Sequence, residues 1–218
     1  MALALFDLDN TLLAGDSDYL WGQFLAEHRI VDGESYEARN RHFYQQYLDG
    51  SLDIFEFLDF QLHPLATHAR ADLERWRAEF LVEKIEPILS PKARELVETH
   101  RARGDVLAVI TATNRFITEP IVNRFGITDL LATEPEERDG RFTGRVSGTP
   151  CFQDGKVTRL KAWLERTGHA LTGSWFYSDS HNDLPLLSLV DHPVAVDPDD
   201  KLRREAHQRN WPIISLRN

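Results

Sequence analysis

The chain begins with an apolar run that leads directly into two carboxylates. Residues 2–6 are nearly all apolar, the pattern of a strand buried on both faces of a parallel sheet. Asp7 and Asp9 follow at once, and the apolar Leu12 and Leu13 come next. In open α/β sheets the ligand site lies beyond the carboxyl ends of the strands, so we expect both acids at the rim of a crevice. A solvated turn is the alternative, but it leaves the flanking apolar residues unexplained.

Composition excludes several classes of function. The chain has 218 residues, of which 42% are hydrophobic, enough for one large domain or for one domain with an inserted module. A formal net charge of -10 argues against non-specific nucleic-acid binding, and no stretch has the length of a membrane span. The single cysteine, Cys151, excludes an internal disulfide and fits a reducing compartment. With no signal peptide visible, we expect a cytoplasmic protein.

The segment FDLDNTL, residues 6–12, carries a family resemblance. It resembles the first motif of the haloacid dehalogenase superfamily, whose phosphatases carry D-x-D-x-[TV] after the first strand. Asp7, Asp9 and Thr11 occupy the three fixed positions. A motif this short can arise by chance, so the resemblance requires three further elements in the same order along the chain.

The second and third elements follow in order. A second apolar run, residues 106–110, ends at Thr111, and VITATN is similar to the superfamily's second motif, a lone Ser or Thr after a hydrophobic strand. In DGKVTRLKAWLE, Lys156 stands near the start of an expected helix, where the third motif has its lysine. Lys161 lies a turn further in and fits less well. Alone, an isolated lysine is more commonly a solvated surface residue.

The fourth element follows another apolar run, residues 174–177. There SDSHND resembles G-D-x-x-N-D, with Asp179, Asn182 and Asp183 retained and Ser178 where glycine is common. All four elements therefore occur in order, each at a strand end or a helix start. The chain is similar to the superfamily along its whole length.

The region between the first and second motifs has no strand pattern. Apolar residues at helical spacing predict four helices there, the third of which stops around Pro64. We expect the aromatic residues of these helices to form a small core of their own. The predicted division is a helical cap over residues 16–86 and an α/β core over residues 1–15 and 87–218.

The inserted helices make the branch that contains phosphoserine phosphatase the closest resemblance, together with relatives that act on histidinol phosphate. The implied fold is a doubly wound, Rossmann-like parallel sheet with the site at its carboxyl edge. Later in the chain we expect a short strand at residues 130–132 and a hairpin turn at Asp139 and Gly140.

The resemblance implies a magnesium-dependent phosphomonoesterase acting on a small phosphorylated metabolite. Asp7 would be the nucleophile and form an aspartyl-phosphate. Mg²⁺ would be held by the carboxylates of Asp7 and Asp179 and by the backbone carbonyl of Asp9, because it prefers oxygen ligands. Asp183 would fix either the metal's water shell or Lys156. The groups expected to hold or neutralise the phosphoryl oxygens are Thr111, Ala112, Thr113, Asn182 and Lys156, with Thr11 supporting the first motif.

Asp9 indicates the type of reaction. Its side chain can protonate the leaving alcohol and then take a proton from the attacking water. In the superfamily, dehalogenases lack an acid at this position and transport ATPases carry threonine there, so Asp9 favours phosphoester hydrolysis. A phosphotransferase or mutase is the alternative enzyme, and a non-catalytic binding module the alternative class. The sequence does not indicate an oligomeric state.

Two positions bear on the substrate. Asp16 stands where phosphoserine phosphatases hold the substrate ammonium, although an aspartate there is equally a helix cap. Those enzymes hold the substrate carboxylate with an arginine in a helix after a Gly-x-Leu turn. The matching stretch, residues 50–62, has no arginine or lysine, and Gln61 stands where the arginine is expected.

These positions favour a cationic substrate. A buried carboxylate without a partner is costly, so we expect phosphoserine to be poorly bound. The aromatic, acidic insertion instead favours a ring-bearing amino-alcohol phosphate, of which histidinol phosphate is the member in the same branch. Phosphoserine remains the alternative substrate if Arg39, Arg41 or Arg70 folds into the site.

Overall fold

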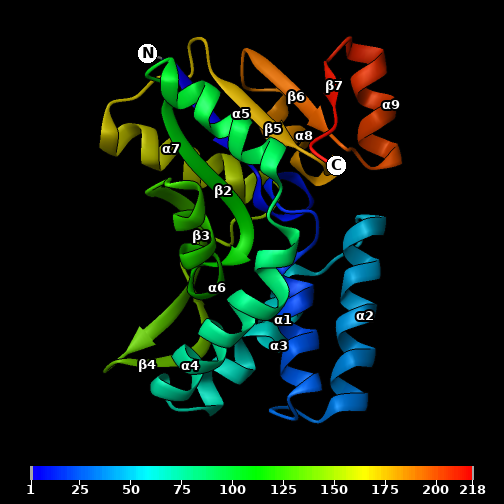
Figure 1. Cartoon of the computed structure of the whole chain (residues 1–218), viewed down its shortest axis with the longest axis vertical. Helices are drawn as coiled ribbons and strands as arrows, with labels where there is room; N and C mark the ends of the chain where they lie inside the picture. Colours follow the sequence, from blue (N-terminus) through cyan, green and yellow to red (C-terminus); the bar gives the residue numbers. More distant parts are fainter. Residues whose placement is uncertain (1, 218) are drawn as a thin grey trace.

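A seven-stranded sheet forms the centre of the computed structural model, which describes residues 2–217 (Figure 1). The strand order is β4-β3-β2-β1-β5-β6-β7, and every neighbouring pair is parallel except β3 and β4. This confirms the doubly wound α/β fold. The strands are β1 (Leu3–Phe6), β2 (Val106–Asn114), β3 (Asp129–Arg138), β4 (Arg141–Ser147), β5 (Trp175–Ser178), β6 (His192–Val196) and β7 (Ile213–Ile214).

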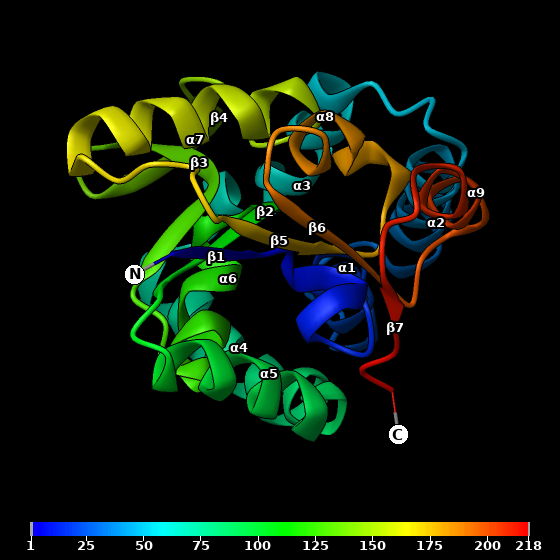
Figure 2. The ribbon, with the colours of Figure 1, turned by 90° about the horizontal axis from the view of Figure 1, so that it is seen from above.

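Strand β1 is buried on both faces, as its apolar run predicts. Leu3 and Leu5 belong to one hydrophobic cluster, whereas Ala4 and Phe6 belong to another, because successive side chains point to opposite faces. Two layers of helices cover these faces (Figure 2). One face is covered by α7 (Asp154–Thr167), α8 (Leu184–Leu187) and α9 (Asp200–Arg209), the other by α5 (Pro91–Ala102) and α6 (Arg115–Val122).

Four helices lie between β1 and β2 in the chain, as predicted. They are α1 (Ser17–Glu27), α2 (Gly33–Asp49), α3 (Ile54–Thr67) and α4 (Arg70–Phe80). Figure 1 shows them beyond the carboxyl end of β2, on the side of the sheet where a ligand site is expected. None of the helices among the described residues is both long and apolar enough to span a bilayer.

The inserted helices share most of their core with the sheet. Trp21, Phe24 and Phe80 belong to the same buried cluster as Phe6 and Val109. The expectation of a separate aromatic core holds only for a small second cluster around Tyr36, Phe43 and Phe60. The division of the chain into core and cap at residues 15 and 87 stays a prediction.

Pro64 does not stop α3, which continues to Thr67. A proline inside a helix removes one backbone hydrogen bond, the one to the carbonyl four residues earlier. Here the loss falls in the last turn, and the same turn buries Leu65 while Ala66 lies close to β4. A Cβ built on Gly144 of β4 would lie 3.1 Å from the Ala66 Cβ, so the strand requires a glycine at this contact.

Two strands are longer than their apolar runs. β2 continues past Thr111 to Asn114, with a shift of register against β3 in its last residues. β3 continues as a charged, partly exposed ribbon that turns at Asp139 and Gly140 into β4, which confirms the hairpin. Only the part of a strand that lies inside the core is hydrophobic. An apolar run therefore predicts the ends of β2 and β3 too early.

Candidate active site

A tight turn after β1 presents the first motif. The Asp7 amide donates to the Tyr177 carbonyl of β5 at 2.9 Å, which completes the sheet up to the start of the turn. Asn10 then adopts a left-handed conformation with φ 54°, and its amide donates to the Gly15 carbonyl at 2.9 Å. Leu12, fully buried, anchors the turn in the core. The chain reverses directly beneath the insertion, with the acids facing the carboxyl edge of the sheet.

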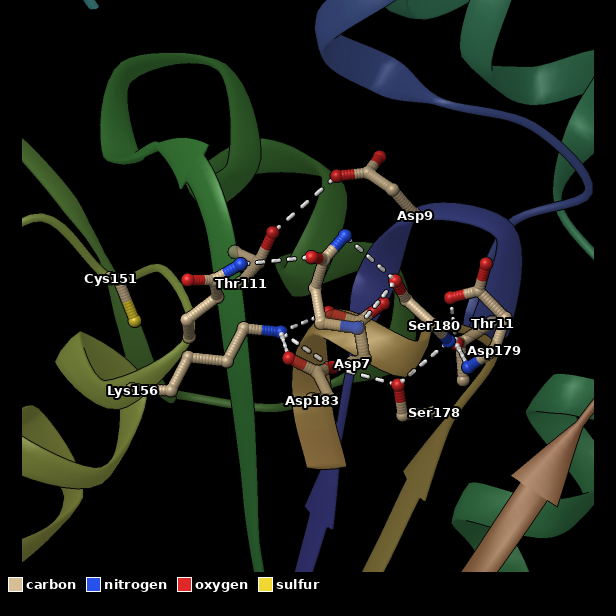
Figure 3. Close-up of polar contacts among 12 residues, drawn as sticks. Asp7, Asp9, Thr11, Thr111, Cys151, Lys156, Ser178, Asp179, Ser180 and Asp183 are labelled. Atoms are coloured by element: carbon tan, nitrogen blue, oxygen red, sulfur yellow. Dashed lines mark hydrogen bonds and ion pairs between the residues drawn. The ribbon is translucent and has the colours of Figure 1, made fainter. Parts of the chain in front are cut away.

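Asp7, Lys156 and Asp183 form a buried ion cluster (Figure 3). The Lys156 Nζ donates to Asp7 Oδ1 at 2.7 Å and to the Asp183 carboxylate at 2.8 Å. Burial raises the pKa of Asp7 to about 7, and the Lys156 ammonium opposes that rise. Burial acts to lower the pKa of Lys156, but Asp183 and Asp7 together raise it above its usual range, so the ammonium stays charged.

The start of α7 places Lys156 in this cluster. The lysine stands in the first turn of the helix, as predicted, and only 3% of it is exposed. The preceding loop passes so close that a Cβ on Gly155 would lie 2.0 Å from the Pro150 carbonyl oxygen. Any side chain at position 155 would push the loop away and displace Lys156 from Asp7.

Asp179 lies at the end of β5 and is held by the first motif. The Thr11 hydroxyl donates to Asp179 Oδ1 at 3.1 Å, and its oxygen lies 3.1 Å from the Asp179 amide, which donates to it. Burial raises the pKa of Asp179 well above its usual range, and the charges of Asp7 and Asp183 raise it further. Three buried carboxylates therefore surround one ammonium, which leaves negative charge for a cation to neutralise.

Asp9 has both carboxylate oxygens engaged. Oδ1 accepts from the Ser17 amide at 2.6 Å, and Oδ2 accepts from the Thr113 hydroxyl at 2.8 Å and from the Thr111 hydroxyl at 3.4 Å. In Figure 3 Asp9 lies apart from Lys156, on the far side of Thr111. The structure thus brings Thr111 and Thr113, both expected to bind phosphate, against the expected general acid, and they line one cavity with Ala112.

The fourth motif joins the sheet to the insertion. Asn182, expected to bind phosphate, donates from Nδ2 to the Tyr47 carbonyl of α2 at 3.2 Å and accepts from Gln153 at 3.0 Å. Ser178, which stands in place of the common glycine, donates its hydroxyl to Asp183 at 2.7 Å. This hydrogen bond from Ser178, which sequence reasoning missed, helps to hold Asp183 against Lys156.

The catalytic candidates open into a cavity roofed by the insertion. Together with the solvent at its open mouth, the empty space between the lining residues is about 630 Å³. Asp7, Asp9, Lys156 and Asp183 line this cavity, whereas Asp179 is not among its lining residues. The aromatic lining consists of Tyr19, Phe43, Tyr44, Tyr47, Phe57 and Phe152. Five of these side chains come from the insertion, and one of them, Phe43, also belongs to its small aromatic cluster.

Asp16 fits both functions considered for it. Its Oδ1 accepts from the Tyr19 amide at 2.8 Å and so caps α1, and its side chain also lines the cavity. Burial raises the pKa of Asp16 to about 7, and the charge of Asp9 adds to the rise. Capping and ligand contact are thus compatible in one carboxylate.

The arginines considered as carboxylate partners lie elsewhere. The Arg39 guanidinium packs over the Phe60 ring at 4.7 Å, and Arg70 pairs with glutamates on the surface, while Arg41 is exposed. Among the residues that the structure describes, Lys156 is the only lysine or arginine lining the cavity.

The sequence reasoning missed three polar groups of the cavity wall: Asp18, Asn40 and the free oxygen of Gln61. Asp18 gave a signal, because it shares the spacing of Trp21 and Leu25 and so falls on the apolar face of its helix. An acid on a buried helical face is rarely left without a role. Gln61 gave a partial signal, because it stands where an arginine is expected, whereas Asn40 gave none, because only helix packing brings it to Gln61.

The oxygen donors suit a magnesium site completed by the substrate. Among residues 2–217 no three acidic, histidine or cysteine side chains converge closely enough to form a metal site by themselves. Mg²⁺ commonly takes one or two carboxylates and fills its octahedral shell with waters and substrate phosphate. Asp7 and Asp179 are two buried carboxylates close enough for the charge of Asp7 to raise the pKa of Asp179, so they would be such a pair.

Known proteins resemble this chain over its whole length. A family model described as haloacid dehalogenase-like hydrolase matches residues 4–188. A histidinol-phosphatase from Neisseria meningitidis serogroup C (strain 8013) is 47% identical and aligns over 99% of both chains. A crystal structure of a protein of unknown function from Bordetella pertussis Tohama I has a TM-score of 0.93 at 46% identity, with 99% of both chains covered. A phospho-aspartyl intermediate analogue of phosphoserine phosphatase has the same fold, with a TM-score of 0.73 at 19% identity, covering 100% of this chain and 94% of the other. The chain belongs to the haloacid dehalogenase-like hydrolase family and is a phosphatase.

Proposed function

We propose that this phosphatase hydrolyses an amino-alcohol phosphate, with L-histidinol phosphate as its substrate. The observation that carries the proposal is the cavity itself, which Asp7 and Lys156 line and whose aromatic wall contains further acids but, within residues 2–217, no further lysine or arginine. Such a wall attracts a cationic, ring-bearing group and repels a carboxylate. The 47% identical relative named histidinol-phosphatase supports the same assignment.

The reaction proceeds in two displacements on phosphorus. The Asp7 carboxylate attacks the phosphoryl group, an oxygen–phosphorus bond forms, and the ester bond to the alcohol breaks as Asp9 gives that oxygen a proton. Asp9 then takes a proton from water, whose oxygen attacks phosphorus and releases phosphate from Asp7. Two displacements replace one very slow reaction, the uncatalysed hydrolysis of a phosphate monoester.

The remaining side chains neutralise charge and orient the phosphoryl group. Lys156, bonded to Asp7 at 2.7 Å, neutralises charge that develops on the phosphoryl oxygens. The Thr111 hydroxyl and the amides of Ala112 and Thr113 hold those oxygens. Asp183 acts on Lys156 rather than on the reacting atoms, which favours one of the two roles expected for it. Asn182 completes the phosphate-binding wall.

Mg²⁺ fits this donor set because buried negative charge exceeds the single ammonium. The carboxylates of Asp7 and Asp179 and the carbonyl of Asp9 would hold it. When bound, the ion neutralises charge on the phosphate and on the attacking carboxylate.

We also propose that residues 16–86 act as a cap over a site carried by residues 1–15 and 87–218, in a cytoplasmic enzyme for a small metabolite. The aromatic and acidic cavity residues that α1, α2 and α3 supply support this division of labour.

The test is release of free phosphate from L-histidinol phosphate, with magnesium present or removed by EDTA. We expect activity that EDTA abolishes and magnesium restores, and that Asp7→Asn lowers by at least about 10³-fold, because the amide cannot serve as the carboxylate nucleophile. Asp59→Asn, an exposed change of the same kind in α3, is the control. Asp7→Asn activity within tenfold of wild type contradicts the covalent route, and an isomerised product in place of phosphate indicates a mutase.

A further inference from the structure

We propose that Asp18 and Gln61 form a second recognition point in the cavity, a subsite that accepts the N–H groups of a planar nitrogen heterocycle such as imidazole. The proposal rests on the proposed function and extends it, because it assigns the ring of the substrate to named atoms. Asp16 would hold the ammonium group. The residues of the subsite belong to α1, α2 and α3 and line the same cavity as the phosphate-binding residues.

Asp18 is a buried acceptor with a free oxygen. Only 6% of the residue is exposed, and its side chain lines the cavity. Its Oδ1 has no hydrogen-bond partner among the residues that the structure describes. A buried carboxylate oxygen without a donor is costly, and native proteins rarely leave one unless a ligand or water supplies the hydrogen bond.

Gln61 supplies a second free acceptor, and its orientation is fixed by a relay. The Tyr19 carbonyl can only accept, so Asn40 must present Nδ2 to it, as it does at 3.0 Å. Asn40 Oδ1 then accepts from Gln61 Nε2 at 3.3 Å, which leaves Gln61 Oε1 without a partner within the described chain. The relay forces Gln61, which is 1% exposed, to offer the cavity an oxygen rather than an N–H.

Close helix packing holds the relay in place. A Cβ on Gly22 of α1 would lie 2.5 Å from Asn40 Nδ2, so α2 can bring Asn40 to the Tyr19 carbonyl only because position 22 has no side chain. Asn40 is itself 2% exposed and has no room to turn away. The packing of α1 against α2 therefore determines that Gln61 presents a hydrogen-bond acceptor to the cavity.

The cavity wall around Asp18 and Gln61 determines which chemical group can bind there. Two acceptors require a ligand with two donors, and the aromatic side chains around them favour a flat ring with positive charge. An imidazolium is planar, cationic and carries an N–H on each of two ring nitrogens. A carboxylate in the same place would face Asp18 and Gln61 Oε1, both acceptors. The subsite thus separates a heterocyclic amino alcohol from phosphoserine.

The experiment measures binding by calorimetry in magnesium buffer and compares L-histidinol with L-phenylalaninol. Both have the ammonium, the alcohol and a ring, but only histidinol has ring N–H groups. We expect wild type to bind histidinol about 10- to 100-fold more tightly, the usual effect of a charge-assisted hydrogen bond. Asp18→Asn should reduce that ratio to within about threefold of one, and Gln61→Met should reduce it in the same direction. Asp59→Asn should leave it unchanged.

The outcomes separate this subsite from the proposed function. A wild-type enzyme that binds histidinol no better than phenylalaninol overturns the subsite, as does an Asp18→Asn enzyme that keeps the full ratio. If wild type discriminates but does not release phosphate from L-histidinol phosphate, the proposed substrate is wrong and the subsite stands. If the Asp18→Asn variant does not fold, the comparison of histidinol with phenylalaninol in wild type and in Gln61→Met tests the subsite.

Discussion

At the scale of single residues, burial and hydrogen bonds have opposite effects on the pKa of Asp9, the proposed general acid. Hydrogen bonds from the Ser17 amide and the Thr113 hydroxyl fix its carboxylate, and burial raises its pKa. A carboxyl group whose pKa is raised keeps a proton to a higher pH and can give it to a leaving alcohol.

Asp9→Asn removes this proton transfer and nearly preserves the shape of the side chain. We expect a loss of roughly 10² to 10⁴ in kcat for L-histidinol phosphate, the usual contribution of a general acid. Nitrophenyl phosphate has a leaving group that needs no proton, so its kcat should fall much less. Steady-state rates for both esters check this, and equal losses would contradict the acid role.

The sequence indicated the proposed site residues Asp7, Thr111 and Asp179 because each follows an apolar run at the carboxyl edge of the sheet. Asp7, Thr111 and Asp179 come from three adjacent strands, and parallel pairing alone brings them together. Asp18 and Gln61 line one cavity only because separate helices pack together, and helical spacing indicates no more than that Asp18 lies on a buried face. Their roles follow from atoms left without partners, and a sequence does not show those.

At the scale of elements, α1 combines a helix cap with a wall of the cavity. Asp16 caps the helix through the Tyr19 amide and lines the cavity. The two functions can be separated by substitution, because serine also accepts at an N-cap but carries no charge.

The Asp16→Ser variant should therefore melt within about 2 °C of wild type, because the helix cap remains. Its KM for L-histidinol phosphate should rise about tenfold, because the charge is lost. Asp16→Ala should raise KM similarly and also lower the free energy of unfolding by about 1 kcal/mol. Thermal melts and steady-state kinetics on the two variants check both effects. An unchanged KM in Asp16→Ser would leave Asp16 as a cap alone.

Element boundaries were the least predictable part of the fold. The third inserted helix passes through Pro64 because Leu65 of its last turn is buried. β3 extends beyond its apolar residues because β4 pairs with it outside the core. In both cases a tertiary contact stabilises backbone whose local sequence predicts an end.

At the scale of the whole molecule, the site concentrates negative charge that the fold must tolerate. Burial raises the pKa of Asp7 and of Asp16 to about 7, from an ordinary value of 3.8. Between these values the folded protein holds protons that the unfolded chain has released. Each group therefore stabilises the fold at low pH, and its contribution is lost as the pH rises through about 7.

We accordingly expect Asp16→Asn to flatten the pH dependence of stability between about pH 4 and 7 in EDTA. The wild-type free energy of unfolding contains a component from Asp16 that falls with rising pH, and the amide does not titrate. Urea unfolding of both proteins across this range checks the difference. Identical slopes would mean that Asp16 titrates normally in the folded enzyme.

The alternation of strands and helices along the chain and the position of the insertion were predictable, because apolar runs and helical spacing persist along the chain. The shared core of insertion and sheet was not, since Trp21 and Phe24 have the same helical spacing whether they pack within a cap or against β1 and β2.

The most direct test of the account is a comparison of kcat/KM for L-histidinol phosphate and L-phosphoserine with the purified enzyme and magnesium. The cavity offers acceptors to a cationic ring and, among the described residues, no lysine or arginine besides Lys156. We predict that kcat/KM is higher for L-histidinol phosphate by at least about 10²-fold, because phosphoserine leaves its carboxylate without a partner. More efficient turnover of phosphoserine would contradict the substrate assignment.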